Sequence, residues 1–143
     1  GVQLEVGSVA TDFEHRSFAQ ELALCHRYYL NYLKTDGSNV GSNVPFAVGT
    51  WYNSGYLFCH VRFPVPMRAA PTLISSNNTN DFYALIGTTV DYYDSNTMSG
   101  GVTNMHARII PNVGTAAGGS SSSCVVLHTE DGSTAKLAFD AEI

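Results

Sequence analysis

The sequence predicts a mainly β protein: an antiparallel β-sandwich or jelly roll with one N-terminal α-helix, which we expect to be a homotrimer. From residue 44 to the end, about eight short apolar runs alternate with turn residues, as in sandwiches and jelly rolls. Only residues 11–36 have the spacing of a helix. Charged residues make up only 13% of the chain, which suits a β-rich protein with a polar, uncharged surface.

Residues 1–10 are predicted to be an extended lead-in from an upstream module. Val2, Leu4 and Val6 alternate with polar residues, which is the period of a half-buried strand. Because the chain begins in the middle of this pattern, we expect it to be the C-terminal end of a longer protein, or the ordered part of one.

The N-terminal helix is predicted over residues 11–36. Thr11 followed three residues later by Glu14 is a capping box, in which each side chain satisfies a backbone N–H of the first turn. Asp36 followed by Gly37 ends the helix, because Gly readily adopts the left-handed conformation.

An apolar stripe runs along this predicted helix at spacings of four, three, four and three residues. Its members are Phe18, Leu22, Cys25, Tyr29 and Tyr32. The stripe has two interpretations: the helix packs across its own sheet, or it forms a threefold bundle with copies of itself. In the second case these five residues form the oligomer interface.

Three segments near the start share a family resemblance. Residues 3–8 read QLEVGS, residues 10–18 read ATDFEHRSF and residues 21–29 read ELALCHRYY. This series resembles a segment of tailed-bacteriophage structural proteins, whose general form is QLE.GS.AT.FE.R…EELALC.RYY. Residues 63–72 and 139–143 look like the rest of the same module, so the resemblance covers most of the chain.

The resemblance implies a phage virion component, assembled in the host cytoplasm with copies of itself and other phage virion proteins as partners. The segment occurs especially in the distal parts of tail fibres, which implies a role in host attachment. Such fibres are typically trimers, and cyclic symmetry lets one patch satisfy every copy. The resemblance therefore favours the threefold bundle.

Residues 44–143 are predicted to form the β head domain. Two runs around the turn Asn53-Ser54-Gly55 indicate one hairpin, and two runs around Asp131-Gly132 indicate another. The predicted strands are Val44–Tyr52, Tyr56–Phe63, Thr72–Ser75, Phe82–Thr89, Val102–Ile110, Cys124–Glu130 and Ser133–Ile143.

Composition and spacing argue against several classes of function. The net charge is −5 and no Lys/Arg cluster is visible, so we expect no nucleic acid partner. No apolar run approaches the ~18 residues of a membrane span, so we expect no membrane insertion. We interpret Cys25 and Cys59 as buried thiols, and neither the cysteines nor the histidines have metal-ligand spacing. We therefore expect no metal and no cofactor.

We also expect no enzymatic activity. Acid pairs elsewhere in the chain are explained by a cap, a turn or an exposed strand face, which leaves Asp91 and Asp94 as one weak candidate pair. No nucleophile elbow and no phosphate-binding glycine loop with a following Lys is present.

Aromatic and amide side chains are concentrated in three predicted loops. Aromatic rings offer flat apolar faces to sugar C–H groups, and Asn and Asp bind hydroxyls. The candidate glycan-binding residues are Trp51, Tyr52, Tyr56, Asn78, Asn80, Asp81, Tyr83, Tyr92, Tyr93 and Asp94. The alternative is that these are ordinary strand-end tyrosines and turn residues.

These observations predict a distal tail-fibre domain that attaches to a host surface polysaccharide or lipopolysaccharide. Two alternatives remain. One is a capsid decoration or another head or tail structural protein without a receptor. The other is a polysaccharide depolymerase spike domain, which the short chain and the lack of paired acids disfavour.

Overall fold

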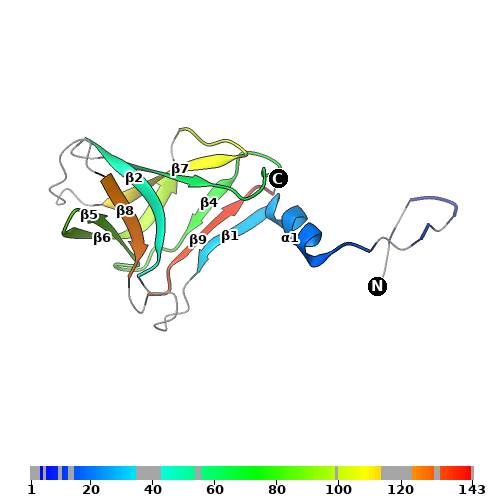
Figure 1. Ribbon diagram of the computed structural model, residues 1–143, viewed down its shortest axis with the longest axis horizontal. Helices are drawn as coiled ribbons and strands as arrows, with labels where there is room; N and C mark the ends of the chain where they lie inside the picture. The colour runs from blue at the N-terminus through cyan, green and yellow to red at the C-terminus, as the bar shows by residue number, and fades with distance from the viewer. Residues whose placement is uncertain are drawn as a thin grey trace.

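The computed structural model is an antiparallel β body from which one short helix projects, with the N-terminal segment beyond it (Figure 1). The structure describes residues 4, 6–9, 11–12, 15–34, 43–53, 56–98, 100–113, 124–130 and 133–142. Within this part of the chain there are nine strands and one helix. The expected mainly β fold with one N-terminal helix is confirmed.

Helix α1 spans Phe18–His26, and a capping box at Ser17 fixes its start. The Gln20 backbone N–H donates to Ser17 Oγ at 3.3 Å, and the Ser17 backbone N–H donates to Gln20 Oε1 at 2.8 Å. The predicted start at Thr11 is wrong, because Thr11 lies in irregular chain before this cap. The same sequence pattern occurs twice, and only the second copy directly precedes helical residues.

Tyr29–Lys34, predicted as the second half of the helix, form strand β1 instead. β1 pairs antiparallel with β9 (Lys136–Asp140), which places Leu30 opposite Phe139. Leu30 is buried in the core, and aromatic and branched side chains suit a half-buried pleated surface. Pairing with β9 therefore overrides the helical spacing. Residues 35–36 lie outside the described residues.

Six strands close a barrel in the order β2-β3-β7-β6-β5-β8. Closure gives every strand a hydrogen-bonded neighbour on both sides, where the two sheets of a sandwich would leave edges. The strands are β2 (Pro45–Asn53), β3 (Tyr56–Arg62), β5 (Phe82–Ile86), β6 (Thr89–Met98), β7 (His106–Val113) and β8 (Cys124–Thr129).

The remaining strands form a three-stranded sheet in the order β1-β9-β4, where β4 is Thr72–Ser75. Phe139 on β9 packs against Phe63 and Tyr32, with ring centroids 4.8 Å and 5.9 Å away. Sheet and barrel share one apolar core. Its large fully buried side chains include Leu57, Met67, Phe82, Ile109, Leu127, Leu137 and Phe139.

One of the two predicted hairpins is confirmed. β2 and β3 pair antiparallel, with Trp51 opposite Leu57. The hairpin predicted across Asp131-Gly132 is wrong: β8 pairs with β2 and β5, whereas β9 pairs with β1 and β4. Both edges of each strand are occupied by other strands, β8 in the barrel and β9 in the separate sheet.

Strand β6 lies where the sequence predicted a loop around Tyr92 and Tyr93. It forms a hairpin with β5 in which Ile86 lies opposite Thr89. Gly87 turns the chain at a φ of 61°, a conformation that Gly adopts without steric cost. On β6, Tyr92 is exposed and Tyr93 is buried, as the alternation of a strand requires.

Candidate functional site

The ten predicted glycan-binding residues do not form one surface. Trp51, Asp81 and Tyr93 are each only 2% exposed, so they are not available to a surface ligand. Tyr93 stacks on Phe82 inside the barrel, with ring centroids 5.5 Å apart. These three predictions are wrong. Strand alternation turns the Trp51 and Tyr93 side chains inward, whereas Asp81 is buried just before β5, where its carboxylate binds Asn78. The Tyr56 side chain lies outside the described part of the structure.

The amides and acids of the predicted second loop mainly stabilise the loop itself. Asp81 Oδ2 accepts hydrogen bonds from the backbone N–H and side-chain Nδ2 of Asn78, at 3.4 Å and 3.0 Å. Asn80 has a φ of 57°, and its backbone N–H donates to Asp94 Oδ1 at 2.7 Å. These contacts give Asn78, Asp81 and Asp94 a structural role: Asn78 and Asp81 bind each other within the loop, and Asp94 on β6 binds the loop backbone.

Tyr83 and Tyr92 do come together, on the outer face of the barrel. They lie opposite one another on β5 and β6, with ring centroids 5.9 Å apart. His128 on β8 lies opposite Tyr83 on the other side and stacks on its ring at 4.8 Å. We call Tyr92, Tyr83 and His128 the aromatic ladder. His128 is not among the sequence-based candidates, because the pairing of β5 with β8 is not visible in the sequence.

Polar groups border the aromatic ladder. The Tyr83 hydroxyl donates to Asn43 Oδ1 at 3.3 Å, and His128 Nδ1 lies 3.2 Å from the Asn43 carbonyl oxygen. Partial burial, and then the nearby Glu130 and Tyr92, raise the pKa of Tyr83 above its ordinary value. A phenol is protonated at neutral pH even at its ordinary pKa, so the Tyr83 hydroxyl is a hydrogen-bond donor there.

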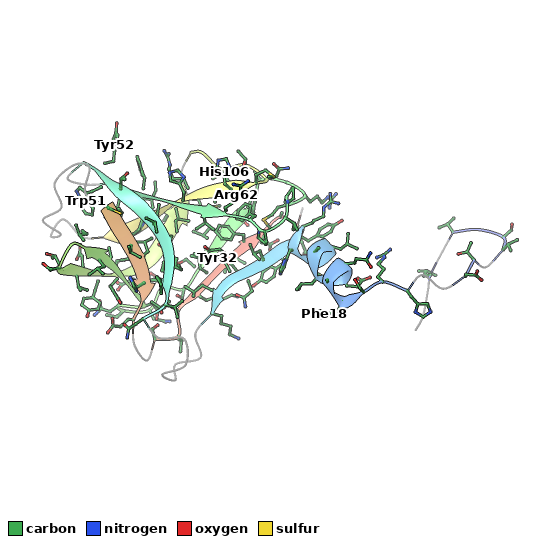
Figure 2. All side chains as sticks on the ribbon, viewed as in Figure 1. Phe18, Tyr32, Trp51, Tyr52, Arg62 and His106 are labelled. Atoms are coloured by element: carbon green, nitrogen blue, oxygen red, sulfur yellow. The ribbon has the colours of Figure 1, made fainter. Side chains whose placement is uncertain are left out.

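A second cluster, of which only Tyr52 is among the sequence-based candidates, lies on the outer faces of β2, β3 and β7. His60 lies opposite Arg108, and Arg62 lies opposite His106. Figure 2 shows Arg62 and His106 side by side on this face of the barrel and Tyr52 at the end of β2. We call the cluster of Tyr52, Phe58, His60, Arg62, His106 and Arg108 the basic face.

In one half of the basic face, the Phe58 ring contacts both Tyr52 and Arg108. Tyr52, which is 63% exposed, stacks on Phe58 with ring centroids 5.1 Å apart. Arg108 Cζ lies 4.3 Å from the Phe58 ring centroid, a cation–π contact. The guanidinium is therefore held against an aromatic ring on the rigid barrel wall.

A hollow of about 410 Å³ opens in the other half of the basic face. Its lining includes His60, Arg62, Met105 and His106. The His106 Nδ1 atom lies 3.2 Å from Thr103 Oγ1, which orients the imidazole. The sequence carried one signal for this cluster, since residues 44–80 and 95–129 contain no Asp or Glu.

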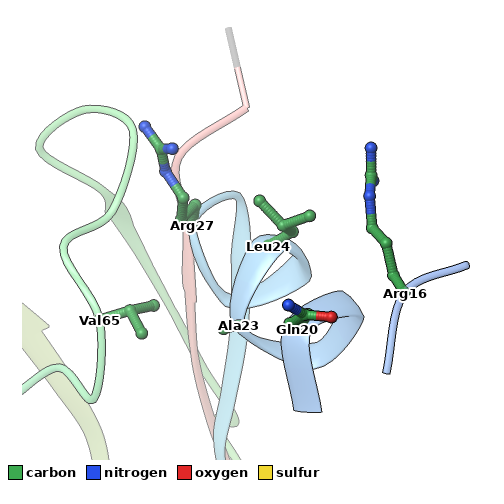
Figure 3. Close-up of a pocket in the computed structure, with 6 residues that line it drawn as sticks. All are labelled: Arg16, Gln20, Ala23, Leu24, Arg27 and Val65. Carbon is green, nitrogen blue, oxygen red and sulfur yellow. The ribbon is translucent and has the colours of Figure 1, made fainter. Parts of the chain in front are cut away.

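Another hollow, of about 370 Å³, lies between helix α1 and Val65 (Figure 3). Ala23 and Leu24 form its apolar part, and the Arg16 and Arg27 side chains border it. Arg16 Nη1 lies 3.3 Å from Glu21 Oε1, so an acid neutralises charge beside this hollow.

The predicted oligomer interface is divided between two elements. Phe18 is 82% exposed on α1, Leu22 and Cys25 are exposed on the same helix, and Tyr29 is exposed on β1. The prediction that Tyr32 lies in the oligomer interface is wrong, because its ring packs on Phe139 of the same chain. The continuous stripe does not exist, because the helix ends at His26.

The exposure of Cys25 and Cys59 depends on the element that carries each of them. Cys59 is fully buried in the barrel, as expected, whereas Cys25 is exposed because no residue of the short helix α1 is buried. Cys124 is exposed, and all three thiols are free. Among the described residues, no group of three His, Cys, Asp or Glu side chains could hold a metal ion.

No helix within the described ranges is long and apolar enough to cross a membrane. Comparison of the whole chain with protein-family models, with curated proteins and with solved structures gave no match.

Proposed function

We propose that this chain is a structural component of a phage virion: a distal tail-fibre domain that attaches to host cells by binding a surface polysaccharide or lipopolysaccharide. The observation that carries the proposal is the aromatic ladder, where Tyr92, Tyr83 and His128 lie side by side on an outer barrel face. The virion assignment rests on the sequence resemblance.

The chemistry of the aromatic ladder suits a sugar. Tyr92 is 46% exposed at one end of the ladder and offers an apolar ring surface to sugar C–H groups. Asn43 and Glu130 lie beside Tyr83 and supply amide and carboxylate partners for hydroxyls. Because the rings stand on hydrogen-bonded strands, little conformational entropy is lost on binding.

Oligomerisation through helix α1 is the second part of the proposal. An isolated helix of nine residues is below the ~12–15 residues at which helices become even marginally stable in water. Phe18, Leu22 and Leu24 nevertheless leave apolar surface exposed on it. Burial of these side chains between copies of the chain would stabilise the helix, and a cyclic trimer satisfies all copies equally.

We also infer that the architecture is a jelly roll. The strands β1-β9-β4 would form one layer, and β2-β8-β5-β6 of the barrel wall would form the other. Both successions occur in the observed strand orders. Jelly rolls are frequent among virion and lectin domains, which agrees with a glycan-binding virion module.

The glycan-binding proposal is tested with Tyr83→Ala and Tyr92→Ala in glycan arrays and host-cell adsorption. We expect each variant to lose most binding, because loss of an aromatic platform costs about 1 kcal/mol or more per ring. Tyr28→Ala is the matched control: Tyr28 is 42% exposed but lies next to helix α1, away from the ladder. Unchanged adsorption by both ladder variants would instead favour a structural protein without a receptor.

A further inference from the structure

The basic face lies on strands β2, β3 and β7, whereas the aromatic ladder lies on β5, β6 and β8. We propose that the hollow at His60, Arg62 and His106 binds the anionic group of a sugar, a carboxylate or a phosphate, with Arg62 as the main charged contact. The saccharide ring would extend from this hollow toward the stacked Tyr52 and Phe58. The inference rests on residues other than those of the aromatic ladder, so it holds or fails separately.

Two Arg and two His side chains lie together across two paired strands. Arg62 on β3 and His106 on β7 are direct cross-strand neighbours, as are His60 and Arg108. Cross-strand neighbours on one face of a sheet lie close enough for their side chains to contact the same small group. Three donor-bearing side chains, His60, Arg62 and His106, therefore line the hollow, although the whole chain has a net charge of −5. Arg108 lies on the same face, over the Phe58 ring.

Among the described residues, none forms an ion pair with Arg62, the arginine that lines the hollow. All twelve Asp and Glu residues lie within 1–36, 81–94 and 130–143. Strands β2, β3 and β7 and the described connections that follow β3 and precede β7 therefore carry no carboxylate. The hollow at helix α1 differs, because Glu21 pairs with Arg16 there. This contrast singles out Arg62 as the arginine to which an external anion would supply a countercharge.

The backbone beside Arg108 also fits a prearranged site. Gly100 and Gly101 both have positive φ, 58° and 60°, in the connection that leads into β7. A Cβ on Gly100 would lie 2.5 Å from Arg108 Nη2, so the glycine lets the chain pass next to the guanidinium. Together with the Phe58 ring, this close approach limits the positions open to Arg108, and such preorganisation lowers the entropy cost of binding.

The dimensions favour a saccharide over a nucleic acid. A hollow of about 410 Å³ lies within the range of small-molecule sites, about 300–1,000 Å³. Nucleic acid binding instead requires a row of Lys and Arg along several phosphates. Here the face has only two Arg side chains, and acidic segments occupy much of the rest of the sequence. A single anionic group with an attached ring fits this arrangement better.

Binding of defined probes to the intact chain, measured by isothermal titration calorimetry, tests the inference. The probes are tri-galacturonate with its neutral methyl ester, and mannose 6-phosphate with mannose. We expect binding of at least one anion, no binding of its neutral counterpart, and weakening by salt. The two anions separate carboxylate from phosphate as the recognised group. No binding of either anion, or equal binding of the neutral probes, would overturn the inference.

The variants locate the site. Arg62→Gln should weaken anion binding roughly 10-fold, as expected for loss of a charge-assisted hydrogen bond, and Arg62→Gln with His106→Gln should abolish it. Arg68→Gln is the control, since Arg68 is exposed outside the hollow and lies over the Tyr28 ring. Equal losses in the control and in Arg62→Gln would refute a local site.

A ten-nucleotide oligo-dT probe separates the remaining possibility. Binding of oligo-dT that is tighter than that of either sugar, and lost in Arg62→Gln, would identify a nucleic-acid surface and contradict the saccharide.

Discussion

The hydroxyl of Tyr32 on β1 donates a hydrogen bond to the Phe46 carbonyl oxygen on β2 at 2.8 Å. This bond joins the three-stranded sheet to the barrel, and the Tyr32 ring packs edge-on against Phe139 beneath it. The same residue thus connects the two parts of the fold through both a polar and an apolar contact.

Tyr32→Phe should lower the free energy of unfolding by about 1 kcal/mol, because it removes the hydrogen bond and leaves a carbonyl partly desolvated. Tyr32→Ala should cost about 3 kcal/mol or more, because the ring leaves a cavity. Urea unfolding measures both. Tyr29→Phe on the exposed side of β1 is the control and should change little; an equal loss there would contradict the linking role of Tyr32.

Gly49→Ala should destabilise the barrel by about 1–3 kcal/mol or more, as overpacked cores do. A Cβ at this position would overlap the Phe58 carbonyl oxygen and Cys59 Sγ, and would lie 2.7 Å from Cys59 Cα. Since two of the three atoms belong to the backbone, side-chain rotation cannot relieve the clash. Thermal unfolding measures the effect.

Gly87→Ala provides a comparison of a different kind. No atom lies within 4 Å of a Cβ at Gly87, so only the φ of 61° opposes the substitution. We expect a loss of about 1 kcal/mol, typical of a residue held in the left-handed region. A larger loss at Gly87 than at Gly49 would contradict the packing argument.

Alkaline pH should destabilise the fold through Cys59. Burial, and then the nearby Cys124, raise the pKa of the Cys59 thiol from 9.0 to about 12. The unfolded chain therefore releases this proton at lower pH than the folded chain. The stabilisation is complete below pH 9 and is lost as the pH rises toward 12, by up to ~1.4 kcal/mol per pH unit. Tyr93, whose pKa burial also raises, acts in the same direction.

Urea unfolding at pH 7, 9, 10 and 11 tests this dependence. Cys59→Ala should show a shallower decline above pH 9 than the native sequence, whereas Cys124→Ala at the exposed thiol should keep most of it. Parallel declines in all three proteins would show that the buried thiol does not control alkaline stability.

Leu22→Asp should dissociate the proposed trimer. Leu22 is 41% exposed on a helix that buries no residue in its own domain, and a carboxylate there would oppose burial between copies. Light scattering gives the mass in solution. Val90→Asp is the matched control, since Val90 is 43% exposed on the barrel wall.

The two variants together separate three outcomes. Dissociation by Leu22→Asp alone supports the helix interface. Dissociation by Val90→Asp alone would place the interface on the barrel wall. A monomeric native protein would contradict the trimer altogether.

Much of the β architecture could be predicted from the sequence, because alternation and turn residues act locally. The hairpin of β2 and β3 follows from two alternating runs around a short turn. The strand conformation of Tyr29–Lys34 could not be predicted in this way. The spacing of their apolar residues fits a helix, but it also fits a strand when β9 is paired beside it. The prediction of a hairpin across Asp131-Gly132 was wrong for a related reason. A turn sequence does not indicate whether the edges of the two flanking strands are already paired with other strands.

The candidate site was predictable only in part. Tyr83 and Tyr92 were identified from their chemistry, but the register that places them opposite one another, and His128 beside them, is a long-range property. Trp51 and Tyr93 were misassigned because a one-residue difference in alternation decides whether a ring faces solvent or core. The segments without Asp or Glu are the one sequence signal of the basic face. Its cross-strand pairs could not be predicted, because they depend on the long-range pairing of β3 with β7.

The central position of β9 has a consequence for how the chain reaches its native state. Tyr29 on β1 pairs with Asp140, so the three-stranded sheet closes a loop that contains the entire barrel. Bringing such distant positions together costs a large loop-closure entropy before the contacts stabilise the chain. This cost slows folding. We therefore expect the barrel to fold first and β9 to pair last, between β1 and β4. A peptide with the sequence of β9 would then bind between β1 and β4 in the partly folded chain and stop folding at that stage.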